Sequence, residues 1–270
     1  MNKSEPGRYD QLLDLIDEYK PRTLVEIGTY DGRRAMQMAA QALKHQSKVE
    51  YLGFDLFEDA NKDTDLRELN VKKHHSATEV TKALQAFADK HPGFALRLVK
   101  GDTRDIFGNK KVQLDNVDFA FVDGGHSIDT IANDFQAVAH ANAVVLDDYY
   151  KPDGDGKCPD TRKYGCNQLV DQLGPQKCAF LPMTDEVQGG GYVQMVLCNA
   201  PAPKKVRVQV KTMNCVQDVK IAGNVAYSSR IWPSGVWFPK MSPHQHTAVM
   251  VSGGPSIEQY YDRIRVHQKR

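Results

Sequence analysis

The sequence lacks long hydrophobic runs: none approaches the roughly 18–20 apolar residues that a membrane-spanning helix needs. Its first seven residues also lack the apolar core of a signal peptide. Neither sign of charge is in excess, because the formal net charge of the chain is +1. Such a chain has no long-range field that would draw it to nucleic acid or to an anionic membrane. We therefore expect a cytoplasmic protein with neither nucleic acid nor a membrane as its partner.

Cysteine is scarce and irregularly spaced. The five cysteines are odd in number and none forms a Cys-x-x-Cys pair, so the pattern fits neither a disulfide framework nor a common zinc site. The Gly-x-Gly-x-x-Gly fingerprint of dinucleotide-binding domains is also absent. These absences favour a reduced intracellular protein and argue against a dinucleotide ligand.

What the sequence does contain is an alternation of strand and helix patterns over its first two-thirds. We expect strands at 23–27, 49–54, 94–99, 117–122 and 143–146, and a closing hairpin at 177–181 and 191–198. The first five strands each end in an acidic or glycine-bearing loop. This pattern predicts a Rossmann-like α/β fold, in which helices cover both faces of a mostly parallel sheet and ligands bind at the carboxyl ends of the strands.

The pattern changes after residue 200. We expect residues 1–200 to form one domain and residues 201–270 a β-rich C-terminal extension, because apolar and polar residues alternate along 206–210. Residues 247–256 read as a buried strand that runs into a glycine turn, with a helix to follow. This segment is similar to the opening of a second, truncated Rossmann-like domain. The alternative is an arm through which the chain forms a homo-oligomer.

The stretch 23–32 is the most informative part of the chain. A short apolar run leads to Glu26, then to Gly28 and Gly32, and an amphipathic helix pattern follows. A strand that ends in such a turn presents backbone N–H groups and a helix N-terminus at the edge of the sheet. The carboxylate of Glu26 would repel a phosphate there. We expect a ligand with positive charge and hydroxyl groups but no phosphate, and S-adenosylmethionine has this character.

Acidic residues also end the next two strands. Asp55 follows the second strand, where a carboxylate accepts hydrogen bonds from ribose hydroxyls in nucleotide-binding sheets. Asp102 follows the third strand and is placed to meet the adenine amine. Taken alone, each is equally an ordinary solvated strand end. Coupled to the glycine loop, they favour a nucleoside site.

Three further carboxylates follow two strands that should be neighbours in the sheet. Asp123 ends one strand, and Asp147 and Asp148 end the next. Close carboxylates repel one another unless a cation neutralises them, and hard oxygen ligands suit Mg²⁺, Ca²⁺ or Mn²⁺. The sequence therefore predicts a divalent-metal site, with a loop cap and a simple turn as the structural alternative.

His126 lies three residues beyond Asp123, across two glycines. An imidazole there would project beside a metal-bound hydroxyl, and its ordinary pKa of about 6.5 suits a general base. The alternatives are a histidine that bonds only to backbone, and a proton that passes to Asp148 or to water.

Together these residues resemble the class I S-adenosylmethionine-dependent methyltransferases over about residues 8–199. The resemblance is carried by Glu26-x-Gly28-x-x-x-Gly32, Asp55, Phe-Val-Asp123-Gly-Gly-His126-Ser and Leu-Asp147-Asp148-Tyr149. The most similar subgroup is the metal-dependent O-methyltransferases, which include the catechol and macrolide-sugar enzymes. The resemblance implies a seven-stranded sheet whose last strand is antiparallel, and His126 and Asp123 as catalytic residues. It implies cofactor contacts from Glu26, Gly28, Thr29, Tyr30, Gly32, Asp55, Asp102, Thr103 and Asp123, and metal ligation by Asp123, Asp147 and Asp148.

We therefore expect an O-methyltransferase that uses S-adenosylmethionine and a divalent metal, Mg²⁺ by preference, on a hydroxyl of a small molecule or sugar. The loop 151–165, rich in Gly and Asp, is predicted to cover the substrate. Two other functions stay open: a non-catalytic module that binds S-adenosylmethionine or serves an assembly, and an NAD-dependent oxidoreductase on a similar sheet. Methylation of a flipped nucleobase is disfavoured, because no Asn/Asp-Pro-Pro-Tyr motif is present.

Overall fold

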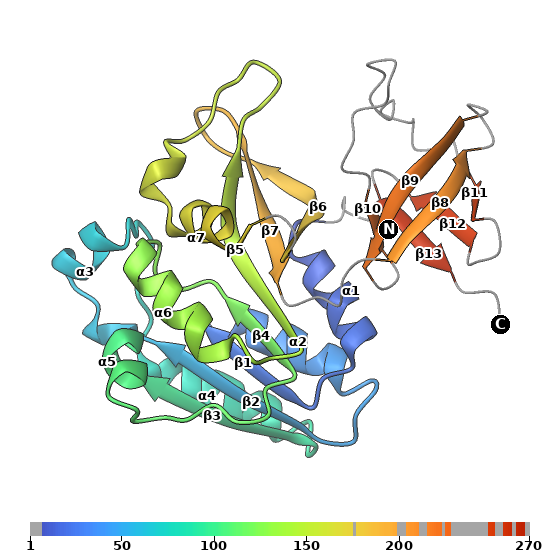
Figure 1. The fold of residues 1–270 in the computed structure, drawn as a ribbon. Coiled ribbons are helices and arrows are strands. Elements are labelled where there is room, and N and C mark those ends of the chain that lie inside the picture. Colours follow the sequence, from blue (N-terminus) through green and yellow to red (C-terminus); the bar gives the residue numbers. More distant parts are fainter. Residues whose placement is uncertain are drawn as a thin grey trace. The chain divides into compact units, whose positions relative to one another are not determined.

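The computed structural model describes residues 7–174 and 177–198 in full, and six later strands by their backbone. The described residues form two compact units, one from most of the chain up to Asn199 and one from the strands after it (Figure 1). None of the helices in these described parts is long and apolar enough to cross a membrane.

A seven-stranded sheet forms the centre of the first unit, in the order β3-β2-β1-β4-β5-β7-β6 (Figure 1). Neighbouring strands from β3 to β5 pair in parallel, and β7 is antiparallel to both of its neighbours. The strands are β1 (Thr23–Ile27), β2 (Val49–Asp55), β3 (Phe94–Lys100), β4 (Phe119–Val122), β5 (Ala143–Lys151), β6 (Cys178–Glu186) and β7 (Tyr192–Cys198). The predicted α/β fold, with its one antiparallel strand, is confirmed.

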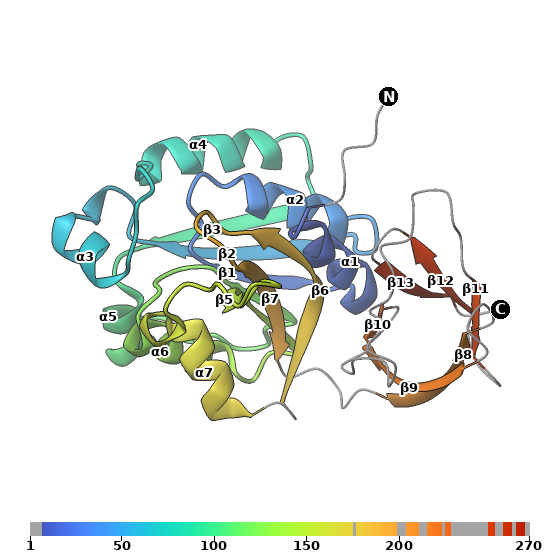
Figure 2. The same ribbon diagram turned by 90° about the horizontal axis from the view of Figure 1, so that it is seen from above.

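Helices cover both faces of this sheet, as Figure 2 shows. One face carries α1 (Asp10–Tyr19), α2 (Arg33–Ala42) and α4 (Ala77–Ala88), and the other carries α5 (Thr103–Gly108), α6 (Ile128–Val138) and α7 (Gly165–Leu173). Every residue of the central strand β4 is buried, because a strand covered on both faces has no solvent side. The carboxyl ends of β1 to β5 therefore meet at one edge, where the loops are free to form a site.

Two short helices lie in loops where the residue pattern shows no helical period. The helix α3 (Lys62–Arg67) begins at the cap residue Asn61, and α5 begins at Asp102, whose side chain accepts a hydrogen bond from the N–H of Arg104. Each has six residues, fewer than two turns, so neither presents an apolar stripe that a periodicity argument could find.

The strand β5 runs further than expected, through the acid pair to Lys151. Its register with β7 shifts between Leu146 and Tyr149, and Asp148 adopts the left-handed conformation at φ +58°. Such a bulge turns side chains away from the regular pleat and is common beside active sites. Asp147 and Asp148 therefore leave the sheet at an irregular point of a strand instead of in a loop.

The strands after residue 203 form a closed antiparallel barrel in the order β10-β13-β12-β11-β8-β9. They are β8 (Lys204–Val210), β9 (Cys215–Ala222), β10 (Val225–Tyr227), β11 (Ala248–Val251), β12 (Ser256–Tyr260) and β13 (Arg263–His267). The β-rich character is as predicted. The prediction of a helix after the glycine turn is wrong, because residues 256–260 form the strand β12, which pairs along its whole length with β13. The interpretation as a truncated Rossmann-like domain or an oligomer arm stays a prediction.

Candidate active site

A cavity of about 580 Å³ lies at the carboxyl edge of the sheet. The loops after β1, β2, β3 and β4 supply most of its lining, together with the segment 64–74. The sequence-predicted residues that line it are Glu26, Gly28, Thr29, Tyr30, Asp55, Asp102, Thr103, Asp123 and His126. Among the described residues, none of the expected cover loop 151–165 lines this cavity. Residues of the polar segment 64–74 line it instead.

Gly28 allows the loops after β1 and β4 to meet. Its φ is +95°, and a Cβ atom there would collide with the backbone carbonyl of Asp123. Its N–H donates a hydrogen bond of 2.8 Å to the carbonyl of Phe54, which fixes the loop against β2 as well. Gly32, at φ +78°, begins α2 and packs on Val80 and Leu84 outside the cavity lining. The first glycine therefore shapes the cavity, whereas the second shapes the helix behind it.

Glu26 is fully buried at the end of β1. The hydroxyl of Tyr51 donates to its Oε2 at 2.5 Å and lies 3.2 Å from Thr29 Oγ1, while Oε1 has no partner among the described residues. Burial raises the pKa of Glu26 to about 8, and the hydrogen bond from Tyr51 opposes part of that rise. A buried carboxylate with one free oxygen favours a cationic ligand group that restores its charge balance.

Asp55 ties two loops to the end of β2. One carboxylate oxygen accepts from the N–H of Tyr30 and the other from the N–H of Phe57, both at 2.7 Å. Both donors are backbone groups in loops, so Asp55 holds the cavity wall as well as facing the cavity. The acidic strand end identified from the sequence thus has a structural task in addition to any ligand contact.

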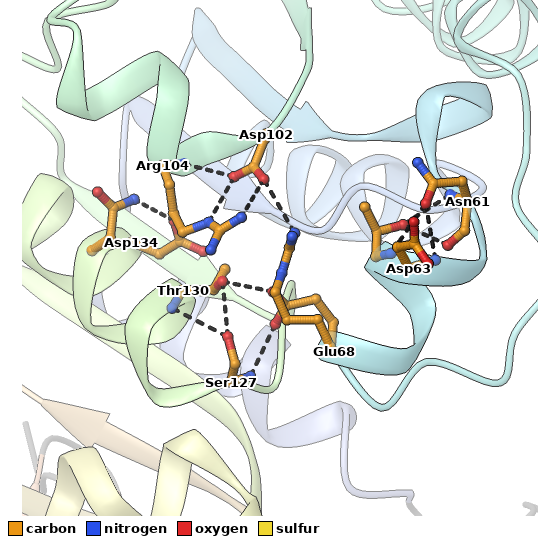
Figure 3. Close-up of polar contacts among 11 residues, drawn as sticks. Asn61, Asp63, Glu68, Asp102, Arg104, Ser127, Thr130 and Asp134 are labelled. Atoms are coloured by element: carbon orange, nitrogen blue, oxygen red, sulfur yellow. Dashed lines mark hydrogen bonds and ion pairs between the residues drawn. The ribbon is translucent and has the colours of Figure 1, made fainter.

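Asp102 is engaged by two arginines, as Figure 3 shows. Arg104 contacts both of its oxygens, at 3.1 and 2.7 Å, and Arg67 reaches one of them at 3.2 Å. The hydrogen bonds from Arg104 lower the pKa of Asp102, although partial burial acts against this. Beside it, Asp134 of α6 is buried and its Oδ2 has no partner among the described residues (Figure 3).

Glu68 fastens the polar segment to the start of α6 (Figure 3). Its carboxylate accepts from the N–H of Ser127 at 2.9 Å and from the hydroxyl of Thr130 at 2.8 Å, and it pairs with Arg67 at 2.7 Å. The N–H groups at a helix N-terminus lack partners within the helix, so a carboxylate there satisfies one of them. Glu68 and Thr130 line the cavity together with His126, so this contact forms part of the cavity wall.

The carboxylates of Asp147 and Asp148 lie behind the main cavity, and with Asp123 and His126 they line a second, much smaller hollow. Burial, and then the neighbouring charge of Asp148, raises the pKa of Asp147 to about 6. Burial and the charges of Asp147 and Asp148 hold the pKa of Asp123 well above its usual range. The predicted acidic cluster is therefore present, and its carboxylates repel one another.

No three acidic, histidine or cysteine side chains in the described parts are arranged to hold a metal ion. Instead, the guanidinium of Arg8 lies 2.6 Å from Asp147 and 3.3 Å from Asp148, and the hydroxyl of Tyr9 donates to Asp147 at 2.8 Å. The expected convergence of three carboxylates on an open cation position is thus not seen.

His126 faces this cluster from the loop after β4. Its Nε2 lies 3.3 Å from Asp148 Oδ2, and its Nδ1 is buried without a partner among the described residues. A carboxylate on one ring nitrogen fixes the imidazole tautomer and leaves the other nitrogen as an acceptor. The ring lines both the cavity and the small hollow, so it links the cofactor side to the acid pair.

Sequence reasoning missed four side chains that organise the site: Arg8, Tyr9, Tyr51 and Glu68. Arg8 and Tyr9 act on residues about 140 positions away, and Glu68 acts across 59 positions. Tyr51 alone carried a signal, since its hydroxyl precedes the apolar residues Leu52 and Phe54 in the strand next to that of Glu26.

Residues 25–149 match the family model of a methyltransferase domain. A search of curated proteins finds no match. Among solved structures, the O-methyltransferase TomG from Streptomyces achromogenes is 15% identical, with 70% of this chain and 77% of that chain covered and a TM-score of 0.46.

An O-methyltransferase from Bacillus cereus is 13% identical (73% and 82% covered, TM-score 0.46). CalS11, a TDP-rhamnose 3'-O-methyltransferase of calicheamicin biosynthesis, is 15% identical (68% and 77% covered, TM-score 0.41). The assignment therefore rests on the family match and on the sheet order, not on these distant likenesses. Residues 25–149, with the glycine loop and the acid-ending strands, therefore form a methyltransferase domain.

Proposed function

We propose that this protein transfers the methyl group of S-adenosylmethionine to a hydroxyl oxygen of a small, polar molecule of the sugar type. The observation that carries the proposal is the position of His126. Its imidazole, held by Asp148, lines the same cavity as Glu26 and Gly28. A proton acceptor thus stands beside the part of the cavity whose residues suit the methyl donor.

The residues present fit S-adenosylmethionine. The free oxygen of buried Glu26 suits an ammonium group, and Gly28, which lines the same cavity, lets the loops after β1 and β4 meet there because it has no Cβ. When bound, the cofactor supplies an electrophilic methyl group and is left as S-adenosylhomocysteine. Asp123 and His126 both follow β4 and both line the cavity, so this loop is placed to contact the cofactor and the substrate.

His126 would act as the general base. Its imidazole would take the proton of the substrate hydroxyl, and the bound cofactor would supply the methyl group to that oxygen. Asp148 holds the ring and stabilises the imidazolium that results, at 3.3 Å from Nε2. Most of the rate would come from placing the oxygen in line with the methyl group.

The polar lining of the cavity favours a substrate with several hydroxyl groups. The segment 64–74 presents Thr64, Asp65, Asn70, Lys72 and His74 to the cavity. Such side chains hydrogen-bond hydroxyls in any of several orientations, whereas a catechol ring would need a flat apolar wall.

A divalent metal on Asp123, Asp147 and Asp148 is the alternative that the sequence predicted. Its ligand chemistry suits Mg²⁺, but the oxygens of Asp147 already bond to Arg8 and Tyr9. The described arrangement therefore does not fit the metal unless Arg8 moves away, and the proposed proton transfer does not depend on it.

The proposal is tested by binding and turnover together. We expect S-adenosylhomocysteine, but not NAD, to raise the melting temperature, and radiolabelled methyl transfer to appear with one or more members of a panel of sugars and polyols. His126→Ala should keep S-adenosylhomocysteine binding and lower the rate by about 10²- to 10⁴-fold. The exposed His140 provides the matched control, because it lies outside both hollows.

Three outcomes would reject the proposal. Stabilisation by NAD alone would favour an oxidoreductase. Binding of S-adenosylhomocysteine with no transfer to any hydroxyl would favour a non-catalytic cofactor-binding or assembly module. Transfer that His126→Ala and His140→Ala affect equally would remove the histidine from the mechanism.

A further inference from the structure

The guanidinium of Arg8 lies inside a group of carboxylates although arginine is usually a surface residue. Its side chain is only 8% exposed, and its Nη1 lies 2.6 Å from Asp147 Oδ1 and 3.3 Å from Asp148 Oδ1. On the other side its Nε forms an ion pair of 3.2 Å with Asp185 of β6. A single cation thus faces three carboxylates from two strands.

Tyr9 completes the arrangement around Asp147. Its hydroxyl donates to Asp147 Oδ2 at 2.8 Å and accepts from Nη2 of Arg8 at 3.1 Å. The ring of Tyr9 is held from its other side by Arg34, whose guanidinium carbon lies 3.7 Å from the ring centre. The two residues before α1 are therefore fixed to the acid pair as one unit.

The four oxygens of Asp147 and Asp148 all have protein partners. Those of Asp147 face Arg8 and Tyr9, and those of Asp148 face Arg8 and His126. A divalent cation needs carboxylate oxygens with free lone pairs at about 2.0–2.6 Å, in a shell that a bulky guanidinium does not share. With Arg8 in place, only Asp123 has a carboxylate free to offer.

The charge of the cluster explains why something positive must stand there. Buried carboxylates without a counter-charge are costly, and removing one partner of a buried ion pair leaves the other uncompensated. Of the groups that face Asp147 and Asp148, Arg8 is the permanent cation, Tyr9 is neutral, His126 is charged only when protonated, and Asp123 adds a further negative charge.

We propose that Arg8 is the resident cation of the Asp123–Asp147–Asp148 cluster, in the position that the sequence pattern reserves for a divalent metal, so that a divalent ion binds there only when Arg8 is removed. Arg8 is then a positioning residue: it neutralises Asp148, which in turn holds His126. The proposal concerns the charge of the cluster and stands whether or not the proposed methyl transfer is correct.

The test is a titration of the full chain with Mn²⁺, followed by electron paramagnetic resonance of the free ion. We expect wild type to show no binding that depends on Asp147. Arg8→Gln should bind about one Mn²⁺ per chain, at least about tenfold more tightly than wild type, because the same carboxylates have lost their cation. This binding should disappear in the double variant Arg8→Gln, Asp147→Asn. Arg8→Lys, which keeps the charge, should restore most of the exclusion.

Lys100→Gln is the matched control. Lys100 also bridges two carboxylates, those of Glu58 and Asp59 at 3.1 and 3.0 Å, but on the surface. It should bind no more Mn²⁺ than wild type, so a gain limited to Arg8→Gln is not a general effect of lost positive charge.

Two results would overturn the proposal. One is that wild type binds Mn²⁺ and that Asp147→Asn abolishes this binding. The other is that Arg8→Gln is folded and binds no Mn²⁺. Should Arg8→Gln lack a cooperative unfolding transition, wild type and Asp147→Asn decide the question. Equal Mn²⁺ binding curves for these two proteins then support the proposal that Arg8 excludes a divalent ion from the cluster. Tighter binding by wild type rejects the proposal.

Discussion

The hydroxyl of Tyr51 donates a hydrogen bond of 2.5 Å to the buried carboxylate of Glu26. The two residues lie on neighbouring strands, β2 and β1, just before the edge where the cavity opens. The bond satisfies Oε2 and leaves Oε1 free. Tyr51 therefore prepares Glu26 to accept a cationic group, although Tyr51 itself does not line the cavity.

Tyr51→Phe should weaken cofactor binding and move its pH dependence. Burial raises the pKa of Glu26 to about 8, so Glu26 gains its charge, and its affinity for an ammonium group, as the pH rises through that value. Loss of the hydroxyl removes an interaction that lowers this pKa. We expect an affinity about five- to tenfold lower near pH 7, equivalent to about 1 kcal/mol, and a rise of affinity displaced to higher pH.

Isothermal titration with S-adenosylhomocysteine from pH 6 to 9 measures both effects. Tyr19→Phe is the control, since Tyr19 is a partly buried tyrosine that packs on Phe119 away from the cavity. Identical pH profiles for wild type and Tyr51→Phe would show that Tyr51 does not tune Glu26.

Glu68→Ala should loosen the polar segment over the cavity. The carboxylate holds three donors, and these hydrogen bonds lower its pKa although burial acts in the opposite direction. Because the folded-state pKa is lowered, this stabilisation is present at neutral pH and lost as the pH falls. We expect the free energy of unfolding at pH 7 to drop by about 2–3 kcal/mol, as for a hydrogen-bonded charge.

Hydrogen exchange should become faster in residues 62–75 of Glu68→Ala, with less change in β4. Glu50→Ala, an exposed glutamate of β2, is the comparison. Unchanged exchange in 62–75 would mean that Glu68 does not hold this segment.

Asp134→Asn should raise the stability of the protein relative to wild type at alkaline pH. Burial, which outweighs hydrogen bonds from Thr103 and Asn133, raises the pKa of Asp134 to about 7. The unfolded chain loses this proton near pH 4 and the folded chain only near pH 7, so wild type loses stability as the pH rises between these values. Asparagine cannot ionise, so the loss should disappear.

Urea unfolding at pH 5 and pH 8 measures this difference. Relative to wild type, Asp134→Asn should gain about 1–3 kcal/mol between the two pH values. The exposed Asp115→Asn should show no such gain. If the stability of Asp134→Asn relative to wild type is the same at both pH values, the raised pKa of Asp134 is contradicted.

The strands were predictable because their signals are local. Val25 and Ile27 belong to one apolar run that ends at Gly28, and the structure places β1 at Thr23–Ile27 as expected. Residues that act over long sequence distances carried no such signal. Nothing near Arg8 indicates that its guanidinium meets Asp147, because that contact depends on how α1 docks against the sheet.

The acid pair, Asp147 and Asp148, also depends on a residue contact that is distant in the sequence. The sequence predicted Asp147 and Asp148 as the loop after a strand, and a loop leaves both side chains free to turn toward a shared cation. They lie instead at a bulge in β5, where the regular alternation of side chains is interrupted, and both carboxylates face the guanidinium of Arg8. Register irregularities of this kind depend on the partner strand β7, which lies more than 40 residues away.

The left-handed conformation of Asp148 supplies the last prediction. At φ +58° a residue with a Cβ is strained by about 1 kcal/mol relative to glycine. Asp148→Ala and Asp148→Gly both remove the contacts with Arg8 and His126. Only the glycine variant also removes the backbone strain, so it should be more stable than the alanine variant by about 1 kcal/mol in urea unfolding. At an ordinary strand position the order is reversed, because glycine destabilises a strand. Alanine as the more stable variant would therefore mean that the backbone at Asp148 is regular, and that His126 is not held by a bulge in β5.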